Sequence, residues 1–287
     1  MERLLIIGCG DIARRTIPLL KDRYRVYALI RNEKQRGALR AQGVVPISGD
    51  LDSRRQLARI GGIADIVLHL APPPDSGTGD TRTRHLLAVL SRRPPHRLVY
   101  ISTSGVYGDC KGERVDETHP LHPQTERALR RVDAEMQIRD WAQQNGVHAC
   151  ILRVPGIYAA ERLPLERLRN GMRSIVAEED GYTNHIHADD LARIIAAALH
   201  HGRPNRVYHA SDDSAMKLGD YFDLLADAHH LPRPQRITRA EAQRVLPEML
   251  LSFMNESRRL RNDRIKRELK VRLLYTTVFS FIGSLLK

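Results

Sequence analysis

Residues 3–13 read Arg-Leu-Leu-Ile-Ile-Gly-Cys-Gly-Asp-Ile-Ala, an apolar run that ends in a glycine-rich turn. Such a turn is typical of a strand followed by a helix whose first N–H groups hold the pyrophosphate of a dinucleotide. We expect Gly8 to make the tight turn and Gly10 to let the phosphate approach the backbone. Asp11 and Ile12 then open the helix at the phosphate. The sequence therefore predicts dinucleotide binding at this turn.

Apolar runs and helical patterns alternate through the first half of the chain. Strands are expected at 3–8, 25–30, 44–47, 65–70, 97–102 and 148–154. Helices are expected between them, at 11–21, 33–42, 53–60, 80–92 and 124–145. Strands that alternate with helices predict an α/β fold of the Rossmann-like type, a doubly wound parallel sheet with right-handed crossovers.

The second half is less regular. Helices are expected at 161–170, 188–201, 215–229 and 239–246, and one more strand at 206–210. We expect residues 1–154 to form the dinucleotide-binding domain and 155–287 a smaller substrate-binding lobe, interleaved in one compact unit. The apolar stretch 273–286 is shorter than the about 20 residues of a membrane-spanning helix, so we expect it to dock on the core.

Composition and charge indicate a globular protein. Hydrophobic residues make up 42% and charged residues 28% of the 287 residues, as in soluble domains. The amino terminus shows no signal-peptide pattern, and the three cysteines lack metal-ligand or redox spacing, so we expect a cytoplasmic protein. The net charge of +12 comes with only 5% aromatic residues, which favours an anionic small molecule over nucleic acid as the partner.

Arg31 ends the second expected strand, where a dinucleotide fold contacts the adenosine ribose. An acidic residue there favours the free 2′-hydroxyl of NAD, whereas an arginine suits the 2′-phosphate of NADP. The sequence thus predicts NADP rather than NAD, with Asn32 and Lys34 as possible helpers. A surface arginine at a strand end explains the same residue equally well.

Further segments, in the expected order, resemble the extended short-chain dehydrogenase/reductase family, which contains nucleotide-sugar epimerases and dehydratases. They are Gly49-Asp50-Leu51, Leu70-Ala71-Pro72, Val99–Gly108 with its Ser-Thr-Ser-Gly-Val-Tyr-Gly run, Arg153–Tyr158 and His185–Leu191. The resemblance implies that Asp50 and Leu51 contact adenine. It also implies that Leu70, Ala71 and Pro72 lie beside the cofactor.

The family's chemistry uses a hydroxyl, a tyrosine and a lysine, with the tyrosine and lysine four residues apart on one helix face. The resemblance implies Thr103 as the hydroxyl, flanked by Ser102 and Ser104. The glutamate that follows the family's lysine matches Glu135, which puts arginines at both remaining positions.

Arg131 takes the lysine position and Arg127 the tyrosine position, so the Tyr-x-x-x-Lys pair is absent. Arg131 could hold ribose or phosphate as a lysine would. Arg127 stays protonated at any working pH, so it would polarise a carbonyl oxygen or bind an anionic group instead. Tyr107, His122 and Tyr158 are the groups whose placement allows them to replace the tyrosine as acid/base.

These observations predict an NADP-dependent oxidoreductase or epimerase-like enzyme that acts on a small carbonyl compound or a sugar nucleotide by an atypical mechanism. The missing pair leaves a second interpretation open, a catalytically inactive NADP-binding redox sensor or scaffold protein. No metal site is expected, because the acidic pair Asp189 and Asp190 suits a helix start beside His185 and His187. The helix at 124–145 and the one before it are natural packing faces for a homodimer.

Overall fold

A central parallel sheet organises the computed structural model, which describes residues 1–285. Its strand order is β12-β7-β5-β4-β1-β2-β3. The bounds are β1 Glu2–Ile7, β2 Tyr24–Ile30, β3 Val45–Ser48, β4 Ile66–His69, β5 Arg97–Thr103, β7 His148–Val154 and β12 Arg206–His209. The order reverses at β1, which pairs with β2 on one side and β4 on the other. The predicted Rossmann-like α/β fold is confirmed.

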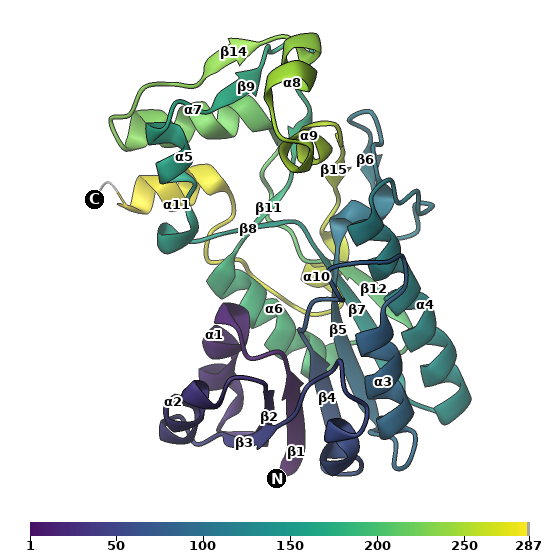
Figure 1. Ribbon diagram of the computed structural model, residues 1–287. Helices are drawn as coiled ribbons and strands as arrows, with labels where there is room; N and C mark the ends of the chain where they lie inside the picture. Colours follow the sequence, from purple (N-terminus) through teal and green to yellow (C-terminus); the bar gives the residue numbers. More distant parts are fainter. Residues whose placement is uncertain (286–287) are drawn as a thin grey trace.

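Helices cover both faces of this sheet (Figure 1). One face carries α1 (Asp11–Leu20), α2 (Arg36–Ala41) and α6 (Ala188–His201), and the other carries α3 (Thr81–Leu90) and α4 (Glu126–Asn145). Because side chains alternate along a strand, Leu4 and Ile6 of β1 pack toward α1 and α6, whereas Leu5 and Ile7 pack toward the opposite face. The apolar run of β1 is therefore buried on both sides.

A second group of elements lies above the carboxyl edge of the sheet (Figure 1). Its short strands are β8 Gly156–Tyr158, β9 Arg173–Ile175, β10 Tyr182–Thr183, β11 His185–His187, β13 Met216–Lys217 and β14 Gln235–Ile237. Its helices are η4 Ala160–Arg162, α5 Leu165–Arg169, α7 Leu218–Ala228, α8 Arg239–Val245, α9 Glu248–Met254 and α11 Val278–Leu285. The remaining elements are η3 Ser104–Tyr107, β6 Arg114–Val115, β15 Arg259–Leu260, which pairs with β6, and α10 Asp263–Arg267.

Several expected helices are shorter or divided in the structure. The helix at 33–42 is a 3₁₀ turn, η1 (Glu33–Gln35), followed by α2, and the helix at 53–60 is reduced to the 3₁₀ segment η2 (Gln56–Ile60). The helix at 161–170 is divided into η4 and α5, which Pro164 separates, and the one at 215–229 starts as β13. Each division falls where the local sequence is polar or holds a proline, so few contacts sustain a continuous helix.

The carboxyl-terminal stretch packs on the protein as α11. Its Val278, Phe281 and Ile282 are buried in an apolar cluster with α7, while residue 286 of the predicted stretch lies outside the described residues. α6 and β12 belong to the sheet layer although they follow Val154. The predicted lobe boundary at 154/155 stays a prediction, as does the homodimer.

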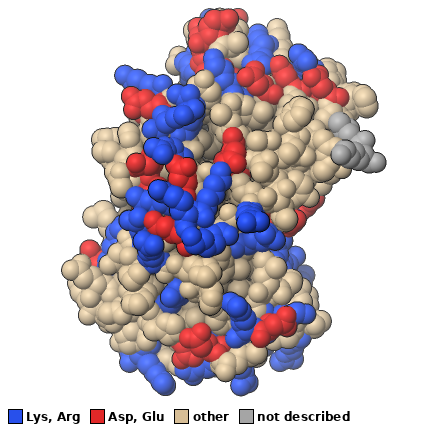
Figure 2. Space-filling view, turned by 180° about the vertical axis from the view of Figure 1, so that it is seen from behind, with Lys and Arg blue, Asp and Glu red and all other residues tan. Residues whose placement is uncertain are grey.

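The basic surface is interspersed with acidic groups. Figure 2 shows lysines and arginines in a band across the middle of one face, with aspartates and glutamates among them. Several cations of the chain form ion pairs, such as Arg206 with Glu268 at 2.6 Å and Arg261 with Asp263 at 2.8 Å. Within residues 1–285, no helix combines the length and apolar character needed to cross a membrane.

Candidate cofactor and substrate sites

A cavity of about 380 Å³ lies over the glycine-rich turn, at the carboxyl ends of β1 to β4. It is lined by Ile7–Gly10, Leu29–Asn32, Gln35, Gly49–Leu51, Ala71, Pro72 and Arg82. In open α/β sheets, ligands bind outside the carboxyl ends of the strands where the strand order reverses. This cavity lies at that point, beside β1.

The two glycines of the turn differ in backbone conformation and in the space around them. Gly8 has a φ of +94°, and a Cβ built on it would lie 2.6 Å from the backbone nitrogen of Ala71. A Cβ on Gly10 would meet no heavy atom within 4 Å. Gly8 is thus required by the protein's own packing, whereas Gly10 leaves open space at the amino end of α1. That space suits a phosphate held by backbone N–H groups.

Most of the predicted cofactor residues line this cavity, namely Gly8, Gly10, Arg31, Asp50, Leu51, Ala71 and Pro72. Asp11, Ile12, Leu70 and Arg131 are not among the lining residues. Asp11 instead binds Arg15 at 3.1 Å and Arg162 at 2.9 Å. These ion pairs hold the pKa of the Asp11 carboxyl below its ordinary value against the opposing effect of burial.

The exposed side chain of Arg31 reaches the cavity from the end of β2. Asn32 lines the cavity too, and its side chain accepts a hydrogen bond from the backbone of Lys34 at 3.0 Å. Gln35 is a lining residue that the sequence analysis did not single out. This strand end therefore contributes the polar side chains of Arg31, Asn32 and Gln35 to the wall of the cavity.

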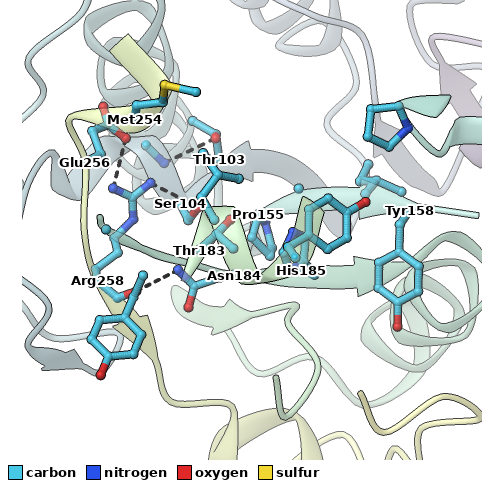
Figure 3. A pocket seen from close by; sticks show the side chains of 18 of the residues that line it. Thr103, Ser104, Pro155, Tyr158, Thr183, Asn184, His185, Met254, Glu256 and Arg258 are labelled. Atoms are coloured by element: carbon cyan, nitrogen blue, oxygen red, sulfur yellow. Dashed lines mark hydrogen bonds and ion pairs between the residues drawn. The ribbon is translucent and has the colours of Figure 1, made fainter. Parts of the chain in front are cut away.

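A second cavity of about 410 Å³ lies between the sheet edge and the upper group of elements. It is lined by Thr103–Gly105, Arg127, Pro155–Tyr158, Pro164, Arg167, Gly181–His185, Leu218, Tyr221, Phe222, Leu250, Met254, Glu256 and Arg258. Figure 3 shows Thr103, Ser104, Glu256 and Arg258 on one side of it and Tyr158 on the other. Polar groups thus gather on the side where β5 ends, and aromatic and aliphatic groups form much of the remainder.

Thr103 is the last residue of β5, and its Oγ1 accepts a hydrogen bond from the N–H of Gly105 at 3.2 Å. Arg127, in the first turn of α4, lines the same cavity. Burial lowers the pKa of Arg127, and the carboxylate of Glu256 acts in the opposite direction. The structure therefore brings the two residues that the sequence analysis singled out to one pocket, although 24 positions separate them in the chain.

Arg131 turns toward the sheet. Its Nη1 donates to the hydroxyl of Tyr100 at 2.9 Å and to the carbonyl of Ile101 at 2.7 Å. Burial raises the pKa of Tyr100 to about 12 even with this cation beside it. Arg131 thus anchors α4 to β5 in this structure and lines neither cavity.

Tyr107 is fully buried in a polar network below the pocket. Its hydroxyl contacts His209 Nε2 at 2.5 Å and accepts from Arg153 at 2.6 Å. Arg153 in turn donates to both carboxylate oxygens of Glu135, at 3.1 and 2.7 Å. Burial raises the pKa of Tyr107 to about 12. These contacts account for the tyrosine as a structural group, and it lines neither cavity.

Of the other proposed replacements, His122 lines neither cavity and Tyr158 forms part of the pocket wall. Tyr158 donates its hydroxyl to Asp212 Oδ2 at 3.0 Å. Burial raises the pKa of Asp212 to about 7. His185, stacked on Tyr221 with ring centroids 4.4 Å apart, has a pKa that burial lowers to about 4, so its ring is neutral at pH 7.

The sequence analysis missed the segment 255–258, which supplies Glu256 and Arg258 to the pocket. Arg258 Nη1 donates to Glu256 Oε2 at 2.9 Å and to the carbonyl of Gly108 at 2.7 Å. No local motif marks these residues, and they lie some 150 positions after Thr103. Within the described part of the chain, no three His, Cys, Asp or Glu residues are grouped as a metal site.

Comparisons with known proteins agree with this architecture. The model of the NAD dependent epimerase/dehydratase family matches residues 4–211. A dTDP-glucose 4,6-dehydratase of Mycobacterium tuberculosis is 26% identical over 189 residues, which is 58% of this chain and 57% of that protein. A protein of the same name from an Actinoplanes species is 26% identical over 135 residues, 44% of this chain and 42% of that protein. The chain thus matches about half the length of these curated relatives.

Solved structures extend the likeness to the whole chain. A functionally unknown conserved protein from Silicibacter pomeroyi is 31% identical, with a TM-score of 0.81 over 99% of this chain and 98% of that one. A double mutant of a dTDP-glucose 4,6-dehydratase from Streptomyces venezuelae, solved with NAD and DAU bound, is 22% identical. Its TM-score is 0.78 over 99% of this chain and 94% of that one, which shows a shared fold.

Proposed function

Since the chain belongs to the NAD dependent epimerase/dehydratase family, we propose that it is an oxidoreductase or epimerase-like enzyme with a nicotinamide dinucleotide cofactor. The cofactor's pyrophosphate would lie over Gly8 and Gly10, with Asp50 and Leu51 at the adenine. When bound, the nicotinamide supplies a site that accepts or returns a hydride. The substrate would be a small carbonyl compound or a sugar nucleotide.

The observation that carries this proposal is the pairing of Thr103 and Arg127 in one cavity above the carboxyl edge of the sheet. Thr103 would donate or accept a hydrogen bond at the substrate oxygen. Arg127 would place a fixed positive charge where a carbonyl oxygen becomes negative, which is electrostatic stabilisation rather than proton transfer. The mechanism therefore differs from that of a tyrosine-dependent member of the family.

Arg131 is still proposed to bind the cofactor ribose, although its guanidinium also contacts β5. Its contacts with Tyr100 and Ile101 fix the amino-terminal half of α4 against β5. A ribose bound near this helix would find a rigid cation rather than a mobile lysine. Binding of the cofactor ribose by Arg131 remains our proposal.

NADP is the proposed form of the cofactor, because Arg31 lines the nucleotide cavity at the end of β2. Calorimetric titration of NADP(H) and NAD(H) tests this. We expect the wild type to prefer the phosphorylated form and Arg31→Ala to lose about tenfold or more of that preference. Arg40→Ala, an exposed arginine of α2 outside the cavity, should keep the wild-type preference. If Arg31→Ala keeps the wild-type preference for NADP(H), Arg31 does not select the phosphorylated cofactor.

Turnover tests the enzymatic proposal itself. NADPH consumption is followed with aromatic aldehydes and aliphatic ketones. UDP-glucose and dTDP-glucose have no carbonyl for NADPH to reduce, so their conversion is followed by chromatography of the products with NADP⁺ present. Tight cofactor binding without turnover of any of these compounds would favour the second candidate function, a catalytically inactive NADP-binding redox sensor or scaffold protein. The arginine at the tyrosine position supports that alternative, since Arg127 cannot serve as a general acid. A sensor must bind a partner protein differently with NADP⁺ and NADPH.

A further inference from the structure

The pocket around Thr103 lacks an obvious group to exchange a proton with a substrate. Oxidation of an alcohol or reduction of a ketone moves one proton along with each hydride, so a general acid/base is needed. Arg127, at the tyrosine position, keeps its proton at any working pH. The group must therefore come from elsewhere in the lining of this cavity.

Other titratable groups of the lining are poorly suited to the task. Tyr158 donates its hydroxyl to the Asp212 carboxyl at 3.0 Å, and burial beside this carboxyl raises the pKa of Tyr158 far above its usual range. Burial raises the pKa of Tyr221 above its usual range and lowers that of His185 to about 4, which makes His185 a weak base. The Tyr182 ring packs against Gly112, with the edge of the ring 3.2 Å from a built Cβ. These four rings form the walls of the pocket.

Glu256 differs from them in position. Its side chain is only 8% exposed, yet it lines the cavity. A methyl group built on Gly105 would lie 3.6 Å from Thr103 Oγ1 and 3.9 Å from Glu256 Oε2. The hydroxyl and the carboxylate therefore flank the same spot at the end of β5, and the carboxylate also acts on the Arg127 charge. Figure 3 shows Glu256 on the side of the pocket that holds Thr103.

The segment that carries Glu256 is held firmly in this place. The backbone of Ser257 binds Asp109 Oδ1 at 2.9 Å and the N–H of Cys110 at 3.0 Å, and its hydroxyl accepts from the N–H of Tyr182 at 2.9 Å. The carbonyl of Arg258 accepts from the Asn184 amide at 2.9 Å. A carboxylate fixed by this many contacts is pre-organised, as a proton-transferring group must be.

Glu256 lies outside the part of the chain that the family model matches. The family model ends at residue 211, and Glu256 lies 45 positions beyond it. Arg127, which stands at the family's tyrosine position, therefore shares its pocket with a carboxylate from a distant part of the sequence.

We propose that Glu256 is the general acid/base of this pocket and takes the role that the helix tyrosine has elsewhere in the family. The inference rests on the proposed oxidoreductase or epimerase-like function. When a substrate alcohol is oxidised, its O–H bond breaks and the proton passes to a carboxylate oxygen of Glu256. The C–H bond on the same carbon breaks, its electron pair leaves with the hydrogen to the oxidised nicotinamide, and a carbonyl forms. Reduction reverses both transfers.

The test compares Glu256→Gln, Glu256→Asp and Glu256→Ala with the wild type on the compound that turns over fastest, either an aldehyde or ketone with NADPH, or UDP-glucose or dTDP-glucose with NADP⁺. We expect Glu256→Gln to lose about 100-fold or more of kcat, the usual contribution of a general acid/base, and to lose its ionisation from the pH profile. Glu256→Asp should keep part of kcat. Added formate should restore activity to Glu256→Ala, which a structural role does not predict. The NADPH dissociation constant, measured by calorimetry, should stay at the wild-type value in all three.

Glu166→Gln, an exposed carboxylate of α5 outside the cavity, is the matched control and should behave as wild type. If Glu256→Gln keeps wild-type kcat and pH profile, the assignment of Glu256 is wrong while the proposed function stands. If the wild type binds NADPH but turns over no compound, the proposed function fails and the inference fails with it. Thermal unfolding of each variant separates loss of chemistry from loss of fold.

Discussion

Gly8 and Gly10 stand two positions apart, yet they are glycines for separate physical reasons. The positive φ of Gly8 and the close approach of Ala71 exclude a side chain for the sake of the fold. The surroundings of Gly10 exclude nothing, because a Cβ would find open space there. The open space at Gly10 is what our proposal of a phosphate at this turn requires.

This contrast gives a paired prediction. Gly8→Ala should lower the free energy of unfolding by at least about 1–3 kcal/mol, since a strained φ adds to a backbone clash. Gly10→Ala should change it by less than about 1 kcal/mol, the scale of an exchange at a helix N-cap, and should still weaken NADP(H) binding. Urea unfolding and calorimetric titration of both variants check this. Wild-type affinity in Gly10→Ala would show that no phosphate lies against that glycine.

Some residues of the candidate site are marked by the sequence immediately around them, and others depend on contacts with distant parts of the chain. The glycine turn, Arg31 and Thr103 follow directly after apolar strand runs, so the alternation of strand and helix predicts them at one sheet edge. Glu256 could not be predicted in this way, because its place beside Thr103 depends on contacts made some 150 positions apart. Arg131 shows the reverse difficulty, since the match to a lysine position could not reveal that its guanidinium is directed at Tyr100.

At the scale of elements, the strands of the sheet could be predicted and the strands of the upper group could not. The sheet strands are continuous apolar runs of four to seven residues bounded by glycine, proline or polar residues. β8 to β11, β13 and β14 have only two or three residues each, too few for any periodicity to show. Their positions are set by the long-range pairs they form, such as β8 with β11.

One contact between elements has a defined pH dependence. Asp212, after β12, accepts a hydrogen bond from the Tyr158 hydroxyl of β8 at 3.0 Å, and burial raises its carboxyl pKa from an ordinary value of about 4 to about 7. As pH rises through this window, the unfolded chain gives up this proton before the folded chain does. The contribution of Asp212 to the free energy of unfolding is therefore present below about pH 4 and is lost as pH rises toward 7.

Asp212→Asn removes this titration and keeps the size of the side chain. Relative to wild type, we expect the variant to gain stability steadily from about pH 4 to 7, by a few kcal/mol in total, because one pKa unit corresponds to about 1.4 kcal/mol. Above pH 7 the difference should be constant. Urea unfolding of both proteins across this range measures it. A difference that does not change with pH would mean that the Asp212 carboxyl titrates at its ordinary pKa.

At the scale of the whole molecule, the two cavities draw mainly on different halves of the sequence, but the two halves do not form separate cores. The cavity over the glycine-rich turn is built from residues before 83, and most of the cavity around Thr103 from residues after 154. The packing is interleaved, however. α6 packs beside α1 on the same face of the sheet, and β12 pairs with β7 at the edge of the sheet. Ile265 and Leu269, near the end of the chain, complete the same apolar cluster.

This interleaving predicts that residues 1–154 cannot fold alone. Without α6, the part of the shared apolar cluster that α1 and α6 form together would face water, at a cost of about 1.5–3 kcal/mol for each large apolar side chain that is exposed. Without β12, the long apolar strand β7 would become an exposed edge that pairs with other chains. We expect the fragment 1–154 to aggregate or to unfold without a cooperative transition, while the full chain unfolds in one. Circular dichroism with urea titration of both decides it. A cooperative transition in the fragment would mean that residues 1–154 form a stable core of their own and that the contacts of α6 are not needed for it.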